Sequence, residues 1–406
     1  MARNVNRRDV LKGAGAAGLA AMAGCLDGDD EGPMVGVLMP ESGDLGTLGA
    51  TIRDGALLAQ TVIERETDVE LDVRVEDTQT DPEAGVSAAE RVVDAGYPAV
   101  VGPAASNVNL PVCRQVFIPS EVVGCSPSST TPELTTLEDD DYVFRTCPSD
   151  ALQGPVMAQV ARERRDAATT STLFLNDDYG QALEGTYVDA FEDDGGDVLE
   201  RVPFEPEQAS YTGRLEEALE PDPDILMVVG FPQSGIQLFR DFYADFDTGV
   251  DIIVPDGLRD SGLPDEVGDD MENVIGTAPL SDGPAADFFN EEYQSEYDSD
   301  PTVFNGQAYD AMAVLALANL AAGVTNDGTD IRDNLREVTA GGGQEFTGAE
   351  LGAAAEAAAD GEDIEYRGVS SEVVFDDNGD MEAITYELFA FEDGGITTVD
   401  TIDFEL

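Results

Sequence analysis

The 406-residue sequence has no histidine and no tryptophan, and its only lysine is Lys12. Without histidine, neither a Ser-His-Asp nor a Cys-His triad can form, and histidine metal sites such as HExxH are excluded. Basic residues are scarce as well, because 20 Lys and Arg stand against 85 Asp and Glu, which gives a formal net charge of −65. Such a polyanion repels nucleic acid, which we therefore exclude as a partner.

Hydrophobic residues make up 42% of the chain, so it is not an acidic disordered tail, and it can bury one large core or two ordinary ones. The acidic residues are dispersed rather than held in one tail. They gather at Asp27–Glu31, Glu138–Asp141, Glu192–Asp194, Asp269–Glu272, Glu291–Glu292 and Asp376–Asp380. Residues 1–24 contain four basic residues and one acidic residue, so the remainder has 16 basic against 84 acidic residues and a net charge of −68.

This self-repulsion destabilises a compact state at low salt, whereas at about 1 M salt the Debye length falls to roughly 3 Å and screens it. We therefore interpret the chain as halophilic, from a salt-loving archaeon. The alternative is an ordinary acidic surface that serves solubility. In either case the surface charge indicates the conditions in which the protein works and does not indicate its substrate.

The N-terminus has the parts of an export signal in order. Twin arginines, Arg7 and Arg8, precede a mildly apolar Ala- and Gly-rich run, and small residues then lead to Cys25. This arrangement resembles a twin-arginine signal with a lipobox, in residues 1–24, and the apolar run is too short to span a bilayer. We expect Cys25 to be lipidated and residues 25–33 to form a linker. The alternative is an uncleaved helix with a buried cysteine.

Three cysteines remain after Cys25. Cys125 and Cys147 each end a predicted strand, so we favour a disulfide between them in an extracellular setting. Cys113 lies in a predicted helix and would be left over. It has few cationic neighbours, so nothing suggests a reactive thiolate.

Apolar strands and amphipathic helices alternate along the chain, which is the βαβ pattern of parallel sheets. The predicted strands are 34–39, 69–76, 99–101, 121–125, 142–146, 172–175, 198–203, 225–229, 252–254, 371–375, 384–391 and 396–402. The predicted helices are 47–66, 82–95, 107–117, 151–162, 180–193, 211–219, 234–243, 285–297, 304–322, 330–339 and 348–360. So many strands fit two α/β lobes better than one sheet.

Two Ser- and Thr-rich loops begin where predicted parallel strands end, and open α/β sheets bind ligands at that edge. Ser106 is placed at a helix N-cap, where backbone N–H groups favour an anion. Ser128 and Thr130 offer donors from the neighbouring loop. Such neutral donors can hold a carboxylate, although simple capping and turn chemistry explains the same residues equally well.

The segments SPSSTTPELT and FRT-x-P-S-D-x-x-Q-G, with VGVLMPESG near the start and VFDDNGD near the end, resemble substrate-binding proteins of branched-chain amino-acid ABC transporters. The resemblance implies a type I periplasmic-binding-protein fold, with two Rossmann-like lobes whose parallel sheets are joined by a three-strand hinge. We place lobe 1 at 33–147 plus 280–367 and lobe 2 at 148–279 plus 368–406. The crossovers then lie near Thr146–Asp150, Gly276–Ser281 and Tyr366–Ser370.

The resemblance also assigns ligand-binding roles. Ser106, Ser128 and Thr130 match the residues that hold the α-carboxylate and ammonium of the ligand, and Asp256 matches the acid that pairs with the ammonium. Tyr179 and Phe231 match positions of the second lobe at the cleft, and Leu48 and Phe304 fall near the pocket for the apolar side chain. Phe231 replaces a tyrosine and cannot donate a hydroxyl hydrogen bond, and Leu48 replaces an aromatic residue of some members.

We therefore expect an extracellular solute-binding protein, anchored by lipid to the outer face of the cytoplasmic membrane. It would capture a small amino acid, branched-chain or related, and deliver it to an ABC permease by hinge closure. We expect a monomer with no catalytic step, no cofactor and no metal. The Asp376–Asp380 loop lacks EF-hand spacing and is predicted to be a hairpin turn. Alternatives are a ligand-sensing module of the same fold, binding of amides or urea-like solutes, and a secreted carboxylate-based hydrolase.

Overall fold

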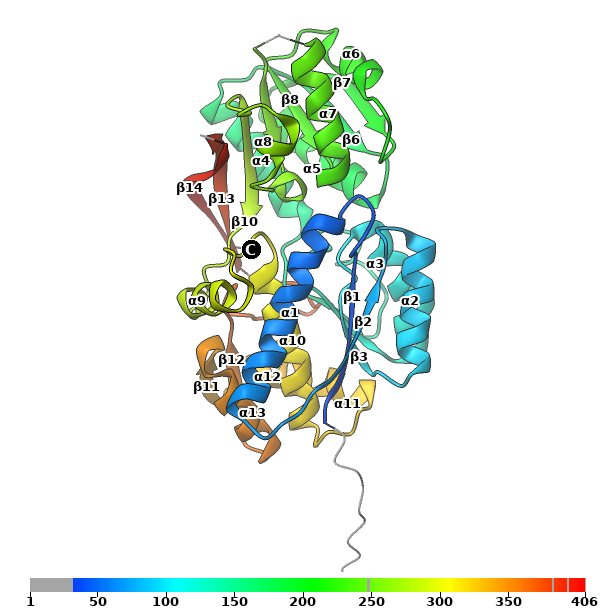
Figure 1. Cartoon of the computed structure of the whole chain (residues 1–406), viewed down its shortest axis with the longest axis vertical. Coiled ribbons are helices and arrows are strands. Elements are labelled where there is room, and N and C mark those ends of the chain that lie inside the picture. Colours follow the sequence, from blue (N-terminus) through cyan, green and yellow to red (C-terminus); the bar gives the residue numbers. More distant parts are fainter. Residues whose placement is uncertain (1–31, 247–248, 382, 393, 406) are drawn as a thin grey trace, which may run out of the picture. The chain divides into compact units, whose positions relative to one another are not determined.

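The computed structural model describes residues 32–246, 249–381, 383–392 and 394–405. Within them the chain builds two main sheets, each flanked by helices (Figure 1). The predicted signal segment and Cys25 lie outside the described residues. None of the helices in the described part of the chain is long and apolar enough to cross a membrane.

The first sheet has five parallel strands in the order β2-β1-β3-β4-β5. Its strands are β1 (Met34–Met39), β2 (Asp72–Asp77), β3 (Ala99–Val101), β4 (Val123–Ser126) and β5 (Val143–Arg145). The apolar runs of β1 and β3 are buried along almost their whole length, as expected for a parallel sheet covered on both faces. The elements around this sheet are called lobe 1 below.

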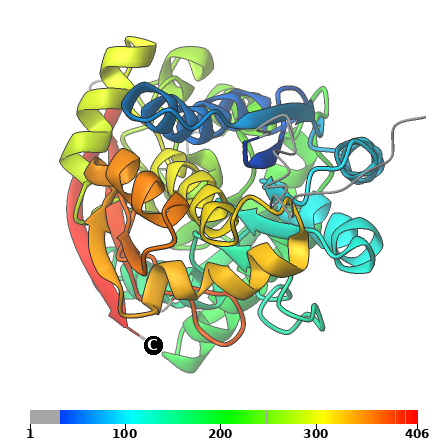
Figure 2. The same ribbon diagram turned by 90° about the horizontal axis from the view of Figure 1, so that it is seen from below.

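Lobe 1 contains most of the helices, and α1 packs against α10 in both views (Figures 1 and 2). Its helices are α1 (Gly46–Glu66), α2 (Pro82–Asp94), α3 (Ser106–Val112), α9 (Ala286–Tyr297), α10 (Asn305–Ala321), α11 (Gly328–Leu335), α12 (Glu337–Ala340) and α13 (Leu351–Ala359). A two-stranded parallel sheet joins β11 (Gln344–Thr347) to β12 (Ile364–Arg367). Helix α10 is buried on every side from Asn305 to Leu320, which makes it the central helix of this lobe.

The second sheet has seven strands in the order β14-β13-β10-β9-β8-β6-β7. Its strands are β6 (Thr169–Leu175), β7 (Asp197–Phe204), β8 (Ile225–Val229), β9 (Asp251–Val254), β10 (Val274–Pro279), β13 (Ala383–Glu392) and β14 (Gly395–Glu405). Its helices are α4 (Asp150–Arg164), α5 (Asp178–Asp193), α6 (Thr212–Leu219), α7 (Pro232–Asp245) and α8 (Leu263–Val267). These elements are called lobe 2, and only β13 and β14 run antiparallel to their neighbours.

The two sheets share one topology. In lobe 1, β1 has the second strand on one side and the third on the other, and β6 is placed in the same way between β7 and β8. In an open α/β sheet, this reversal of strand order leaves a crevice at the carboxyl ends of the strands. The chain passes between the lobes three times, after β5, after β10 and between β12 and β13.

Several local predictions differ from the structure, and neither strands β11 and β12 nor helix α8 were predicted. Strand β10 was not predicted, and the crossover expected near Gly276–Ser281 overlaps its end. A Cβ at position 276 would lie 2.3 Å from the ring of Phe389, so the glycine makes room for a side chain of β13. The predicted strand 371–375 forms only a bridge between Phe375 and Met381. The predicted helix 330–339 is divided into α11 and α12.

The expected Cys125–Cys147 disulfide is not formed, and both residues, like Cys113, are buried free thiols. The register of the sheet explains this. Cys125 in β4 lies opposite Phe144 in β5. Cys147 comes three residues after Phe144, so it is displaced from Cys125 by about 10 Å along the strand direction. A disulfide requires Cα atoms within about 7 Å.

Candidate functional site

A small cavity lies between residues of the two lobes. Its wall contains seven of the eight predicted ligand-binding residues: Leu48, Ser106, Ser128, Tyr179, Phe231, Asp256 and Phe304. Segments that follow β1 and β3 in lobe 1, and β6 and β8 in lobe 2, all contribute to the wall, so the cavity adjoins both points of strand reversal.

The lobe 1 side of the cavity is rich in hydroxyl groups. Ser106 is 2% exposed and is the first residue of α3, so the N-cap position expected for it belongs to Ala105. Its Oγ accepts a hydrogen bond from the backbone N–H of Thr131 at 3.4 Å, and the hydroxyl of Ser129 donates to it at 3.5 Å. Ser128 donates its hydroxyl to the carbonyl of Ala104 at 3.2 Å. These contacts fix the loop after β4 against the start of α3.

Thr130 does not line the cavity, which differs from the expectation for this residue. Its hydroxyl donates to Oδ2 of Asp150 at 3.0 Å, and its carbonyl accepts from the backbone N–H of Asp150 at 2.8 Å. Thr130 therefore ties the loop after β4 to the start of α4. The buried carboxylate of Asp150 takes up the hydroxyl that was predicted to reach a ligand.

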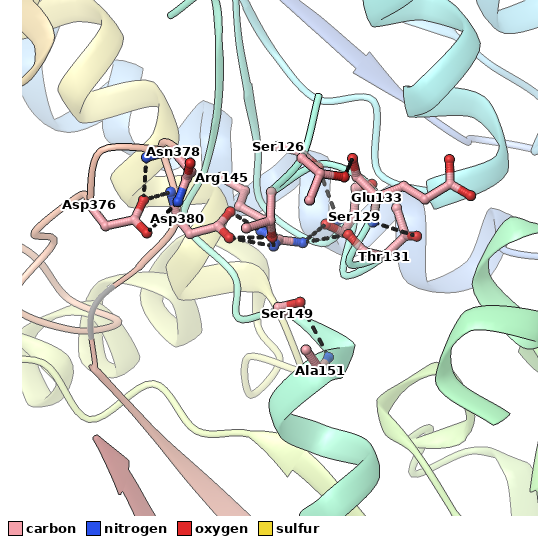
Figure 3. Close-up of polar contacts among 12 residues, drawn as sticks. Ser126, Ser129, Thr131, Glu133, Arg145, Ser149, Ala151, Asp376, Asn378 and Asp380 are labelled. Carbon is pink, nitrogen blue, oxygen red and sulfur yellow. Dashed lines mark hydrogen bonds and ion pairs between the residues drawn. The ribbon is translucent and has the colours of Figure 1, made fainter. Parts of the chain in front are cut away.

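Arg145, which sequence reasoning did not single out, holds the same loop from behind (Figure 3). Its Nη1 donates to the carbonyls of Ser129 and Thr131 at 3.3 and 2.9 Å. Its Nε and Nη2 donate to the two carboxylate oxygens of Asp380 at 2.6 and 2.8 Å. The guanidinium is 1% exposed, so this is a buried bidentate ion pair. The signal for Arg145 was its place in the FRT segment, directly after the loop.

Asp380 belongs to a hairpin turn that docks on the edge strand β5. The carboxylate of Asp376 accepts from the backbone N–H groups of Asn378 and Asp380 at 2.7 and 2.9 Å (Figure 3). The carbonyl of Gly379 accepts from the N–H of Arg145 at 3.0 Å, and a Cβ at this left-handed position would lie 2.5 Å from the carbonyl oxygen of Val143. The hairpin interpretation of Asp376–Asp380 is thus confirmed.

The lobe 2 side of the cavity is aromatic and acidic. The rings of Tyr179 and Phe231 are stacked, with centroids 5.1 Å apart and planes 6° from parallel. The hydroxyl of Tyr179 donates to Oδ2 of Asp256 at 3.4 Å. Phe231 therefore contributes a stacking surface and, without a hydroxyl, donates no hydrogen bond.

Asp256 is 3% exposed, and its Oδ1 has no hydrogen-bond partner among the described residues. Burial raises the pKa of Asp256 from 3.8 to about 6, although the hydrogen bond from Tyr179 opposes the rise. An unpartnered buried carboxylate oxygen is costly, and a cationic group would satisfy it.

A second buried carboxylate, Asp150, lies close enough to interact with Asp256. Burial, and then the charge of Asp256, raise the pKa of Asp150 well above its usual range. Its Oδ1 also has no hydrogen-bond partner in the described part of the chain. Sequence reasoning missed Asp150 because it is one of 85 acidic residues, and only its burial distinguishes it.

Apolar side chains close the remaining wall, and they come mainly from the start of α1 and from Phe304 before α10. Leu48 and Phe304 are 2% and 4% exposed. The wall contains one carboxylate and no basic residue. In the described residues, no group of three Cys, Asp or Glu side chains is arranged to hold a metal ion. The arrangement suits a ligand with a hydrogen-bond-accepting end, a cationic end and an apolar part.

The sequence of the chain was compared with known protein families and proteins. The family model described as "Periplasmic binding protein" matches residues 34–359. The chain belongs to the periplasmic binding protein family. A model of the twin-arginine translocation signal also matches residues 4–24, so the protein carries the signal of an exported protein. The predicted family and the type I fold are confirmed.

Individual relatives agree with this assignment. The chain is 29% identical, over 90% of its length and 88% of the relative, to the chemotactic signal transduction system substrate-binding protein BasB of Halobacterium salinarum. It is 25% identical, over 68% of its length and 75% of the relative, to the leucine-, isoleucine-, valine-, threonine- and alanine-binding protein of Pseudomonas aeruginosa. The structure of LivJ from Streptococcus pneumoniae in complex with isoleucine matches with a TM-score of 0.77 at 19% identity, covering 92% of this chain and all of that one, which shows the fold.

Periplasmic binding proteins of this type bind small ligands and deliver them to an ABC permease; they are not enzymes.

Proposed function

We propose that this protein binds a zwitterionic amino acid with an apolar side chain between its two lobes and delivers it to an ABC permease. The observation that carries the proposal is the unpartnered Oδ1 of Asp256 in the wall of a cavity that contains no basic residue. The ligand's ammonium group would pair with Asp256, because a charge-assisted hydrogen bond is the strongest use of a buried carboxylate.

The other parts of the ligand fit the remaining wall. Its carboxylate would lie against the hydroxyl and backbone donors around Ser106 and Ser128, which Arg145 holds in place from behind. Its side chain would lie among Leu48, Phe304 and the stacked ring of Phe231. A relative described as binding leucine, isoleucine, valine, threonine and alanine supports this ligand class.

The ligand class can be tested by thermal unfolding of the exported domain in 2 M KCl with a matched set of compounds. L-leucine, L-isoleucine and L-valine carry both charged ends. N-acetyl-L-leucine lacks the ammonium, L-leucinamide lacks the carboxylate, and sodium benzoate, acetamide and urea lack the ammonium and the aliphatic side chain. A bound amino acid at 100 times its Kd adds about 2.7 kcal/mol to the free energy of unfolding. Stabilisation by benzoate, acetamide or urea but by none of the amino acids would refute the proposal.

A second candidate, ligand sensing by the same fold, is favoured by the similarity to a chemotactic substrate-binding protein of Halobacterium salinarum. Sensing and transport can use the same cavity, since only the membrane partner differs. Deletion of the gene separates them. Transport predicts loss of amino-acid uptake with intact chemotaxis, and sensing predicts loss of chemotaxis with intact uptake.

We propose further that Cys25 is lipidated and holds the protein on the outer face of the membrane, and that lobes spanning 33–147 plus 280–367 and 148–279 plus 368–406 close about the three crossovers. The match to a twin-arginine signal at residues 4–24 supports export. Cys25→Ser should release the protein into the medium. Retention of this variant on the cells would exclude a lipid at Cys25.

A further inference from the structure

Asp44, in the turn before α1, links the two lobes beside the cavity. Its Oδ1 accepts a hydrogen bond from the backbone N–H of Ser234 at 2.7 Å, and its carbonyl accepts from the N–H of Gln233 at 3.3 Å. The side chain of Gln233 adds a third contact, because its amide donates to the hydroxyl of Thr47 at 3.2 Å. One acidic residue of lobe 1 therefore binds two consecutive N–H groups in the first turn of α7 in lobe 2.

Helix α7 lacks an N-terminal cap of its own. The N-cap position is Phe231, which has no side-chain acceptor, and Pro232 follows it. By contrast, α5 is capped within its own segment, where Asp177 accepts from the N–H of Gly180. The hydroxyl oxygen of Ser234 accepts from the N–H of Glu207 at 2.9 Å. Asp44 thus supplies from the other lobe the carboxylate that an N-cap residue normally supplies.

The same contact positions two walls of the cavity. Leu45 follows Asp44 in the chain, and Phe231 precedes the first turn of α7. Both line the cavity, one from each lobe. A change in the bond between Asp44 and Ser234 would therefore change the distance between the walls that enclose an apolar side chain.

Asp44 is buried in surroundings that disfavour a charged carboxylate. The residue is 4% exposed, and its Oδ2 has no hydrogen-bond partner among the described residues. Burial, together with the negative charges of Glu207 and Asp177, raises the pKa of Asp44 to about 6, although the hydrogen bond from the N–H of Ser234 opposes the rise. The carboxylate at this position costs stability, which an apolar residue would avoid.

We propose that Asp44 is a positioning residue that latches the two lobes around the cavity and so sets the affinity for ligand without touching the ligand. The identity of the ligand rests on the function proposed above, whereas the latch itself does not. A protein whose binding-competent state is only partly populated binds with an affinity reduced by that fraction. Loss of the latch lowers the closed fraction and weakens binding in proportion.

The test compares Asp44→Ala, which removes the side-chain acceptor of the Ser234 N–H and leaves the carbonyl that accepts from Gln233, with Asp44→Asn, which keeps a side-chain oxygen but loses the charge. Asp68→Asn, at an exposed acid of α1's C-terminal side, is the matched control. Spin labels on exposed positions of the two lobes, introduced by Asp94→Cys and Glu216→Cys, report the interlobe distance, since the cysteines in the described residues are buried. Calorimetry in 2 M KCl measures the Kd of L-leucine.

We expect Asp44→Ala to shift the interlobe distances to larger values and to raise the Kd of L-leucine at least tenfold. Asp44→Asn should have interlobe distances and a Kd of L-leucine between those of Asp44→Ala and the wild type, and the control Asp68→Asn should match the wild type in both. Unchanged distance distributions in both Asp44 variants would overturn the latch. If no amino acid binds the wild type, the proposed function fails, and the distances still decide the role of Asp44. If Asp44→Ala does not fold, Asp44→Asn carries the same test.

Discussion

Replacement of Asp256 by asparagine should make the protein more stable and a weaker binder at the same time. Burial holds the pKa of this carboxyl near 6, against 3.8 for an ordinary aspartate. Because the folded-state pKa exceeds the unfolded value, the ionised group costs stability. That cost is absent below about pH 4, grows as the pH rises to about 6, and is complete above it. The pKa difference corresponds to about 3 kcal/mol at most.

Asp256→Asn removes that cost and also relieves Asp150, whose pKa the charge of Asp256 raises. We therefore expect a rise in the free energy of unfolding at pH 8, up to the same ~3 kcal/mol, and little change at pH 4. Removing one partner of a buried charge pair typically costs about 2–5 kcal/mol of binding, which predicts a Kd for L-leucine raised at least ~30-fold. In the wild type the Kd should rise by up to about tenfold per pH unit below pH 6, as Asp256 becomes protonated.

Urea unfolding in 2 M KCl at pH 4 and pH 8, with calorimetry from pH 5 to 8, measures both effects. The control is Glu220→Gln, which removes a charge at an exposed position of the same lobe. Equal stability of Asp256→Asn and wild type at pH 8, together with equal affinity, would refute the assignment. Weaker binding with lower stability would mean that Asp256 supports the fold and does not meet the ligand.

Three further predictions concern the rest of the molecule. Asp380→Asn should lower the free energy of unfolding by about 3–5 kcal/mol because it leaves Arg145 buried without its partner, and Arg145→Met with Asp380→Asn should recover much of the loss; additive losses in urea unfolding would contradict this. Cys113, Cys125 and Cys147 should react with a thiol reagent only after unfolding, and a reductant should leave the unfolding midpoint unchanged; fast reaction of the folded protein would contradict the burial. The unfolding midpoint should rise steeply between 0.1 and 2 M KCl as surface repulsion is screened, whereas a flat profile would contradict the halophilic interpretation.

The arrangement of charge in the structure fits this last expectation. Every arginine in the described residues forms an ion pair with a carboxylate. Since 85 acidic residues stand against 20 basic ones, most carboxylates have no basic partner. Their mutual repulsion is the term that added salt reduces.

Most elements of the fold could be predicted because their signals are local. The apolar run of β1 and the helix cap at Asp81 are read within a few residues. Elements whose form depends on a distant partner were not predictable in the same way. Strand β10 contains Gly276 because Phe389 lies across from it, and Phe389 is more than 100 residues away in the sequence.

The site shows the same division. Ser106 and Tyr179 follow strand ends, where ligands bind in such sheets, and the structure brings both to the cavity. Thr130 also follows a strand end but turns to Asp150, a contact that no local pattern records. Asp44 looks in the sequence like any other acid in a turn, and its role arises only because α7 begins beside it with an uncapped turn.

The sequence by itself determined the chemistry that is absent, the acidic surface, the export signal and the alternating order of strands and helices, because composition and short-range periodicity are properties of the chain. The family resemblance singled out Asp256, whereas only the tertiary structure revealed Asp44 and Asp150 as functional candidates. Asp44, Asp150 and Asp256 have the same side chain as the many solvated aspartates, and they differ from them in burial. Burial raises the free energy of a charge and leaves its oxygens in need of a partner, and it exists only once segments far apart in the chain have packed together.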